Sequence, residues 1–185
     1  MDETIMKTES RRKQMTRLLI RTALVEWMQE KPFERITIKE LCERADVNRT
    51  TFYLHYADQR SVLNDIKEDT KQKTLAIMQG VKLSQDMEAY VVRFLNYVHE
   101  NDKLFRILLM NDEGDRFRYM LIDAVAKELS PHFPRTGDPQ RDAFGAAFLL
   151  SGCTSIIIEW MKTDYAMPAP ELAAYILTIT NSVRW

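Results

Sequence analysis

Two short helices with strong start signals lie close together between residues 37 and 53, and they constrain the fold more than any other feature. Thr37-Ile38-Lys39-Glu40 has the pattern of a capping box, in which the Thr hydroxyl and the Glu carboxylate each satisfy an amide of the first turn. Asn48 is predicted to cap the second helix, which ends near Tyr53. Helices this short are not stable alone, so a third helix must complete their core.

Residues 10–30 supply that third helix. Apolar side chains recur there at helical spacing between Met15 and Met28, and Pro32 marks the stop because it disfavours helical geometry at the residue before it. Leu24 and Trp27 are the residues that we expect to pack on the two short helices. The result is a small three-helix head.

The rest of the chain also predicts helices. Apolar periodicity and caps indicate helices over residues 59–79, 104–110, 140–162 and 170–183, with a turn at 111–114 and a loop at 130–139. Two further helices are expected, one that Ser84 can cap and that includes residues 87–98, and one that Asp115 can start and that includes residues 117–125. The chain has only 5 Gly and 6 Pro, and no segment has the pattern of a strand. The fold class is therefore all-α, with about nine helices.

Charge is distributed unevenly along the chain. The net charge is −1, which excludes a basic coat over the whole protein. Residues 10–60, however, hold eleven Lys and Arg against seven Asp and Glu, a local charge of +4. This asymmetry favours a phosphate-binding head on a more acidic body.

Several classes of function are not expected. The two cysteines, Cys42 and Cys153, are too far apart for a disulfide framework or a zinc motif, and the three histidines lack zinc-binding spacing. There is no Gly-rich phosphate loop and no nucleophile elbow. We therefore expect no metal, no cofactor and no enzyme activity.

The sequence also predicts no targeting signal and no membrane span. The first residues are polar and charged, unlike a secretory signal. The longest uncharged run, 143–158, is shorter than a membrane span needs and contains Ser and Thr. We interpret it as a buried helix and expect a cytoplasmic protein without membrane contact.

The second short helix carries side chains suited to double-stranded DNA. An α-helix fits the major groove, Arg49 can bond the O6 and N7 edges of guanine, and Thr hydroxyls can donate to phosphates or touch thymine methyl groups. Thr37, at a helix N-terminus, can offer its hydroxyl and free amides to a phosphate. Phe52 is predicted to be core, and Tyr56 is expected to pack against the helix after it, with Tyr53 left for DNA.

The segment ITIKELCERADVNRTTFYLHYADQRSVL, residues 36–63, resembles the DNA-binding domain of the TetR/AcrR family of bacterial regulators. The likeness covers about 12–63 and includes the Ile-Thr opening, the Ala-x-Val turn, the Thr-Phe-Tyr triplet, the His-Tyr pair and the closing Leu. Two positions depart from the family pattern. Asp46 stands where the family usually has Gly, and Gln59 followed by Arg60 stands where it usually has Lys.

The resemblance implies a helix-turn-helix at about 37–56 in a DNA-binding domain of residues 1–57, followed by a regulatory and dimerisation domain of residues 58–185. Arg49 and Thr50 are the candidates for base readout. The full set of candidate DNA-binding residues is Thr37, Asn48, Arg49, Thr50, Thr51, Tyr53, His55 and Arg60. The run Arg11-Arg12-Lys13 is either a solvated face or a further contact to the DNA backbone or minor groove.

The second half resembles a C-terminal domain common among TetR-type proteins of Firmicutes, one branch of which includes an activator of a dihydroxyacetone kinase operon. The likeness rests on residues 97–109, on Gly152 and Trp160, and on Pro170-Glu171-Leu172.

The last two helices are the expected dimer interface. The first of them is apolar nearly all round and must be covered on more than one face. Two chains would then form a four-helix bundle, and a reader of palindromic DNA needs such a pair. The candidate interface residues are Phe144, Phe148, Gly152, Ile156, Leu172, Tyr175, Ile176 and Ile179.

An effector pocket is the remaining hypothesis for the C-terminal half. Its candidate residues are Tyr90, Phe94, Tyr97, Met110, Phe117, Met120 and Trp160. Plain core is the alternative, because Met and aromatic residues at helical spacing are typical of a packed interior. The function that we expect is a homodimeric repressor controlled by a small-molecule effector. The alternative is a TetR-like activator or co-regulator that a protein partner controls, with no small-molecule ligand.

Overall fold

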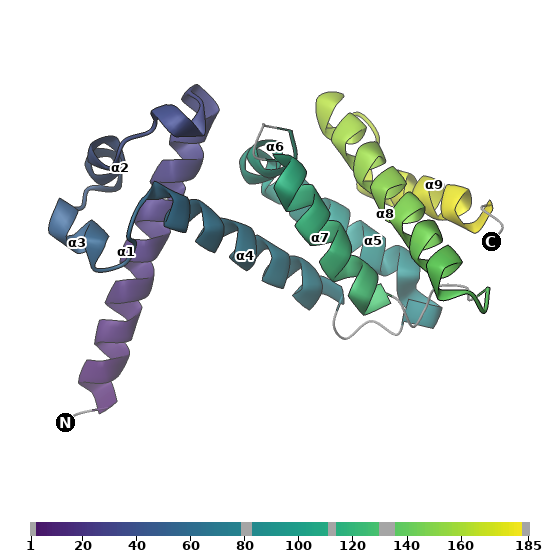
Figure 1. Ribbon diagram of the computed structural model, residues 1–185, viewed down its shortest axis with the longest axis horizontal. Helices are drawn as coiled ribbons and strands as arrows, with labels where there is room; N and C mark the ends of the chain where they lie inside the picture. The colour runs from purple at the N-terminus through teal and green to yellow at the C-terminus, as the bar shows by residue number, and fades with distance from the viewer. Residues whose placement is uncertain (1–2, 79–82, 111–113, 130–135, 183–185) are drawn as a thin grey trace. The chain divides into compact units, whose positions relative to one another are not determined.

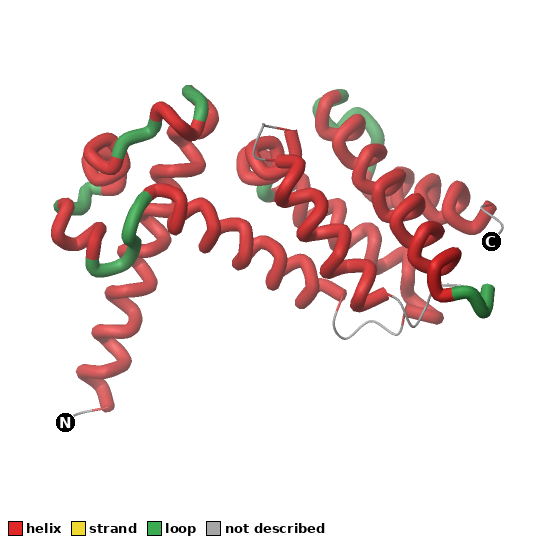
Figure 2. The backbone as a smooth tube through the Cα atoms, viewed as in Figure 1, coloured by secondary structure: helices red, strands yellow, loops and turns green. Residues whose placement is uncertain are grey.

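The computed structural model describes residues 3–78, 83–110, 114–129 and 136–182. In these ranges the protein contains nine α-helices and one 3-10 helix, and Figure 2 shows helices joined by loops without a strand. The predicted all-α fold is confirmed. The elements are α1 (Glu3–Glu30), η1 (Phe33–Arg35), α2 (Ile38–Ala45), α3 (Arg49–Tyr53), α4 (Gln59–Met78), α5 (Leu83–Glu100), α6 (Asp102–Met110), α7 (Gly114–Leu129), α8 (Pro139–Lys162) and α9 (Ala169–Ser182) (Figure 1).

The chain divides into two compact units, Met1–Asp69 and Thr70–Trp185. The division therefore falls inside α4, whereas we expected a domain boundary between residues 57 and 58. The reason is that the first half of α4 packs on the head: Val62, Leu63 and Ile66 are buried there. We call Met1–Asp69 the head and Thr70–Trp185 the body.

The head has one core shared by α1, α2, α3 and the start of α4. Ile20, Leu24, Leu41 and Phe52 are fully buried. Helix α1 begins at Glu3, earlier than the predicted residue 10, because no Gly or Pro in residues 3–10 interrupts it. Long-range burial thus stabilises α2 and α3, which are too short to stand alone.

Trp27 joins α1 to α2, as its position in the sequence predicts. Its indole Nε1 donates to the carbonyl of Glu40 at 3.2 Å. The Arg44 guanidinium lies 3.5 Å from the centre of its ring and the Lys31 ammonium 4.5 Å from it. These cation–π contacts hold the indole between two cations, and Arg44 and Lys31 are themselves paired with Glu30 and Glu40.

The body is a second helical core, which α5, α6, α7, α8 and α9 build together with the end of α4. Leu95, Val98 and Phe105 are fully buried, and the ring of Tyr97 meets Phe105 edge-on at 5.4 Å. Arg106 ties α6 to α8, because its guanidinium donates to the carbonyl of Met161 at 2.9 Å and pairs with Asp102 at 2.6 Å.

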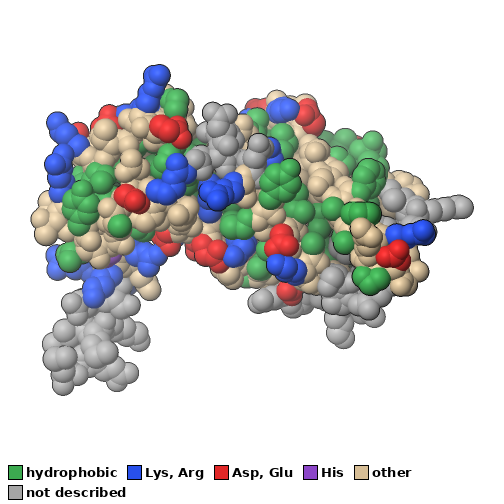
Figure 3. Space-filling view, in the orientation of Figure 1, with side chains coloured by type: hydrophobic (Ala, Val, Ile, Leu, Met, Phe, Trp, Pro, Cys, Tyr) green, Lys and Arg blue, Asp and Glu red, His purple; other side chains and the backbone are tan. Residues whose placement is uncertain are grey.

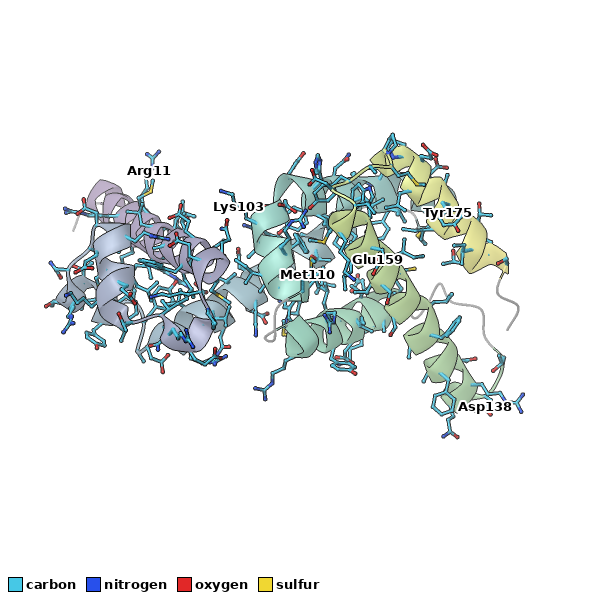
Figure 4. The ribbon with its side chains drawn as sticks, turned by 90° about the horizontal axis from the view of Figure 1, so that it is seen from above. Arg11, Lys103, Met110, Asp138, Glu159 and Tyr175 are labelled. Carbon is cyan, nitrogen blue, oxygen red and sulfur yellow. The ribbon has the colours of Figure 1, made fainter. Side chains whose placement is uncertain are left out.

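Most predicted boundaries of the body agree with the structure within a residue or two. Helix α7 begins at Gly114 rather than residue 115, and α8 begins at Pro139, where Asp138 caps it. Figure 4 shows Asp138 at this start of α8. The predicted helix end at Gly80, the turn at 111–113 and the loop at 130–135 lie outside the described residues.

Helix α8 differs from the expected buried helix. Among the described helices it is the one that has the length and composition of a membrane span, but only 22% of that stretch is buried in the single chain. Core helices of soluble proteins pass the same test of composition. The low burial arises because α8 has one face toward the body and another that no other described segment of the chain covers.

The turn between α2 and α3 yields the first prediction. Asp46 adopts a left-handed conformation (φ 52°, ψ 46°). Because a Cβ atom is unfavourable in that conformation, we expect Asp46→Gly to be more stable than Asp46→Ala by about 1 kcal/mol. Urea unfolding of the two variants measures the difference. Both lack the carboxylate, so equal stabilities would contradict the assigned backbone conformation.

Glu40 yields a prediction about pH. The Lys31 ammonium, followed by the amide and hydroxyl of Thr37, lowers the pKa of Glu40 from 4.5 to about 2. The carboxylate therefore stabilises the fold above pH 4.5, and this contribution is lost as the pH falls toward 2.

We expect Glu40→Gln to lower the melting temperature at pH 7 and to lose this deficit progressively between pH 4.5 and 2. Thermal unfolding of the parent and the variant at each pH makes the comparison. A deficit that stays constant over this range would show that the charge of Glu40 is irrelevant.

Candidate nucleic-acid interface

The turn between α2 and α3 sets the direction in which α3 leaves the core. The left-handed Asp46 ends α2, and the amide of Val47 donates back to the carbonyl of Cys42 at 3.0 Å. Asp therefore supplies the conformation that the family usually obtains with Gly. The departure from the family pattern leaves the tight turn intact.

Helix α3 has one buried and one open side. The Asn48 side-chain carbonyl accepts from the Thr51 amide at 2.7 Å, which confirms the predicted cap. Phe52 is fully buried and anchors the helix, while Arg49 and Thr50 in the first turn are exposed. A guanidinium and a hydroxyl are thus presented to solvent on a helix whose base is fixed in the core.

The candidates that follow Arg49 and Thr50 lie in the second half of α3 and directly after it. The side chain of Tyr53 is 56% exposed, and Thr51 and His55 are half-buried. Tyr56, in contrast, is buried, and its hydroxyl donates to the carboxylate of Asp65 in α4 at 2.6 Å. The two tyrosines lie as the sequence predicts, with Tyr56 in the packing and Tyr53 at the surface.

Two candidates are already engaged within the head. The amide and hydroxyl of Thr37 donate to Glu40 at 2.9 and 2.8 Å in the predicted capping box. In this structure the amide and hydroxyl of Thr37 are therefore already bonded to Glu40. From the sequence we had expected the hydroxyl to be free to bind a phosphate. The guanidinium of Arg60 lies 4.1 Å from the centre of the Phe33 ring, which orients an otherwise exposed side chain.

Basic side chains spread over the head. Arg11, Arg12 and Lys13 are exposed near the start of α1, and Figure 3 shows Lys and Arg side chains gathered over the visible face of the head. Arg17 and Arg21, further along α1, are instead paired with Asp65 and Asp69. The exposed positive charge of the head therefore includes the start of α1, Arg35 in η1 and Arg49 in α3.

The candidate effector residues in the body do not form one site. Tyr90 and Phe94 line a cavity of about 350 Å³, whereas the other five do not. Phe117 and Trp160 are buried in the core, and Met110 is exposed. For Phe117 and Trp160 the plain-core alternative describes the structure.

Most of the residues that line the cavity were not among the effector candidates, for example Thr74, Cys153 and Asn181. No pattern in the sequence signals it, because a cavity depends on volume that side chains from several helices leave unfilled. Among the described residues, no group of three His, Cys, Asp or Glu is arranged to hold a metal ion.

The candidate interface residues of α8 and α9 fall into two groups. Phe144, Phe148 and Tyr175 are 66%, 68% and 53% exposed, and Gly152 is exposed beside them. Figure 4 shows Tyr175 on α9. Leu172 and Ile176 are instead buried within the chain, while Ile156 and Ile179 are intermediate. Because Leu172 and Ile176 are buried, they can support the exposed residues of an interface but cannot contact a second subunit directly.

Two family comparisons agree with this architecture. Residues 20–66 match the family described as bacterial regulatory proteins, tetR family, and residues 85–182 match the family described as transcriptional regulator C-terminal region of the TetR type. The first match covers the core of the head and the second covers most of the body. Together they account for both units.

Individual relatives are similar. The uncharacterized HTH-type transcriptional regulator YxbF of Bacillus subtilis (strain 168) is 24% identical over 175 residues, which cover 90% of this chain and 45% of that protein. The chain thus spans about half the length of this curated relative.

Two solved structures share the fold. A TetR transcriptional regulator from Streptococcus agalactiae 2603V is 26% identical with a TM-score of 0.68, over 94% of this chain and 98% of that one. The dihydroxyacetone kinase operon activator DhaS has a TM-score of 0.61 at 17% identity, over 90% and 94% of the two chains. The capped helix-turn-helix and the matches to both units show that this chain belongs to the TetR family of DNA-binding transcriptional regulators, which are not enzymes.

Proposed function

We propose that this protein is a cytoplasmic, homodimeric repressor that reads a palindromic operator with α3 in the major groove. The observation that carries the proposal is the polarity of α3. Its Phe52 is fully buried, while its Arg49 and Thr50 are exposed to solvent. A rigidly anchored helix that offers a guanidinium to base edges is the arrangement that direct readout requires.

The remaining candidates in and beside α3 are suited to contacts with DNA phosphates. Thr51, Tyr53 and His55 can each offer a donor to a backbone oxygen. Asn48 contributes through its amide nitrogen alone, because its side-chain oxygen is used by the cap. At the start of α2, the contact would come from the backbone amides after Thr37, since the Thr37 side chain is bonded to Glu40.

Repression is the simpler direction of control. A dimer that occupies an operator overlapping a promoter blocks transcription without a further surface, whereas activation needs a surface for RNA polymerase. Measuring transcripts of the neighbouring genes with and without the protein distinguishes the two. Increased transcription in its absence supports repression, and decreased transcription supports the activator alternative.

The uncovered face of α8 supports the dimer. Phe144, Phe148 and Gly152 share that face, and a Cβ atom added at Gly152 would meet nothing within 4 Å in the single chain. Glycine is therefore not required there by this chain's own packing, and it leaves room for the close approach of a second helix. Two recognition helices about 34 Å apart would then meet successive major grooves.

For the reading helix, we expect Arg49→Ala to weaken binding to the operator by about 1–3 kcal/mol and to relax the sequence preference, because its base contact is lost. Thr51→Ala should weaken binding to all sequences more evenly. The assay is fluorescence anisotropy with operator and scrambled duplexes at one fixed salt concentration.

Arg35→Ala is the charge-matched control, because Arg35 is exposed in η1 outside the helix-turn-helix. It should leave the preference for the operator unchanged. If Arg49→Ala and Arg35→Ala behave alike, Arg49 does not read bases.

For the dimer, we expect Phe148→Glu to shift the protein toward a monomer and to weaken operator binding at least tenfold, because a charge would enter an apolar interface. Tyr119→Glu is the control, since Tyr119 in α7 is 75% exposed and outside the proposed interface. Sedimentation velocity measures the assembly. A Phe148→Glu protein that remains dimeric would show that the face of α8 is not the interface.

A further inference from the structure

The reading helix is followed by an exposed apolar side chain that the contacts described so far do not use. Leu54, the residue directly after α3, is 78% exposed, more than any other large apolar side chain in the described part of the chain. It therefore contributes little to the core of the head, in contrast to the fully buried Phe52. Because single exposed leucines are common on protein surfaces, the position of Leu54 must decide what it does.

The backbone places Leu54 on the same face of the helix as Thr50. Leu54 has helical backbone angles (φ −70°, ψ −19°), and its amide donates to the carbonyl of Thr50 at 3.1 Å. Residues four apart in a helix are neighbours on its surface. Thr50 is also exposed and is one of the two candidates for base readout. The open side of α3 thus continues into an apolar side chain one turn later.

An apolar side chain on a helix in the major groove has one complementary group among the base edges, the 5-methyl of thymine. Cytosine and adenine present an amino group there, and guanine presents two acceptors. Against Leu54, these polar groups would lose their water without gaining a hydrogen bond. Thr50 brings a methyl group of its own to the same face. This pair of residues therefore favours thymine over the other three bases.

We propose that Leu54 is a specificity-determining residue, which binds the 5-methyl group of one thymine in each half of the operator. The proposal rests on the proposed function, in which α3 lies in the major groove. It extends that function by naming a second base, because Arg49 would select guanine and Leu54, with Thr50, would select thymine. Burial of one methyl group strengthens binding about fourfold in each half-site.

Deoxyuridine isolates the methyl group, because it pairs as thymine does and lacks only that group. A duplex that the full-length protein prefers is first selected from a random pool. Each thymine, together with its symmetry mate, is then replaced by deoxyuridine, and binding is measured by fluorescence anisotropy at one salt concentration. For one such pair we expect the affinity to fall about fifteenfold, the product of about fourfold in each half-site.

Leu54→Ala is the decisive variant. It should bind the selected duplex at least about tenfold more weakly than the parent protein does, and it should no longer distinguish thymine from deoxyuridine at that position, because the side chain that contacts the methyl group is gone. The preference for the guanine that Arg49 reads should remain. Since Leu54 is exposed, the melting temperature should stay that of the parent protein.

5-Methylcytosine provides the reverse test with the unmodified protein. Replacing the identified T·A pair by C·G should weaken binding. A methyl group placed on that cytosine should then recover about fourfold in each half-site. Recovery would assign the effect to the methyl group, whereas no recovery would show that another feature of thymine is read and would overturn the proposal.

Leu18→Ala is the matched control, because Leu18 in α1 is 55% exposed and lies outside the helix-turn-helix. It should leave both the affinity and the deoxyuridine effect unchanged. The proposal is overturned if no deoxyuridine pair weakens binding, or if Leu54→Ala keeps the full deoxyuridine effect. It is also overturned if Leu54→Ala weakens binding to selected and scrambled duplexes equally, since Leu54 would then contact the sugar-phosphate backbone.

The same measurements separate this proposal from the proposed function. A selection that yields no preferred duplex overturns the reading of an operator, and the role of Leu54 with it. A preferred duplex whose recognition depends on Arg49 but shows no deoxyuridine effect overturns the role of Leu54 alone.

Discussion

The hydrogen bond between the Tyr56 hydroxyl and the Asp65 carboxylate, at 2.6 Å, joins the end of the reading segment to α4. Arg17 of α1 pairs with the same carboxylate at 2.5 Å, so three elements meet at one partly buried charge. Burial and the bond to Asp65 raise the pKa of Tyr56 to about 12, because the buried phenolate would be poorly solvated and would lie beside a carboxylate. The orientation of α3 depends on this junction, because α3 itself has only one buried anchor, Phe52.

Helix α8 organises the body by having two different faces. Its Cys153, Thr154 and Ile157 line the cavity, whereas Phe144 and Phe148 point away from the rest of the chain into solvent. This division explains why the helix is apolar nearly all round although little of it is buried in one chain. In the proposed dimer, a single helix would therefore form both a wall of the cavity and the contact with a second subunit.

Sequence reasoning was most successful where local chemistry decides the structure. The capping box at Thr37 and the cap at Asn48 both appear as predicted, because each depends on residues within one helical turn. Asp46 adopts in the structure a left-handed conformation, which Asp tolerates better than most residues. It was least successful for the effector pocket. Phe117 and Trp160 are large apolar residues at helical spacing, like those that line the cavity, but they are packed in the core. Only contacts between helices distinguish a core residue from a cavity residue.

The sequence by itself determined the all-helical class, the short helix-turn-helix and which side of α3 faces solvent, since propensity, capping and apolar periodicity act over a few residues. Tertiary structure alone decided that the first half of α4 belongs to the head, that Leu172 and Ile176 are buried within the chain, and that Cys153 lines a cavity. These properties depend on how the volumes of distant helices fit together, and no local pattern in the chain records that fit.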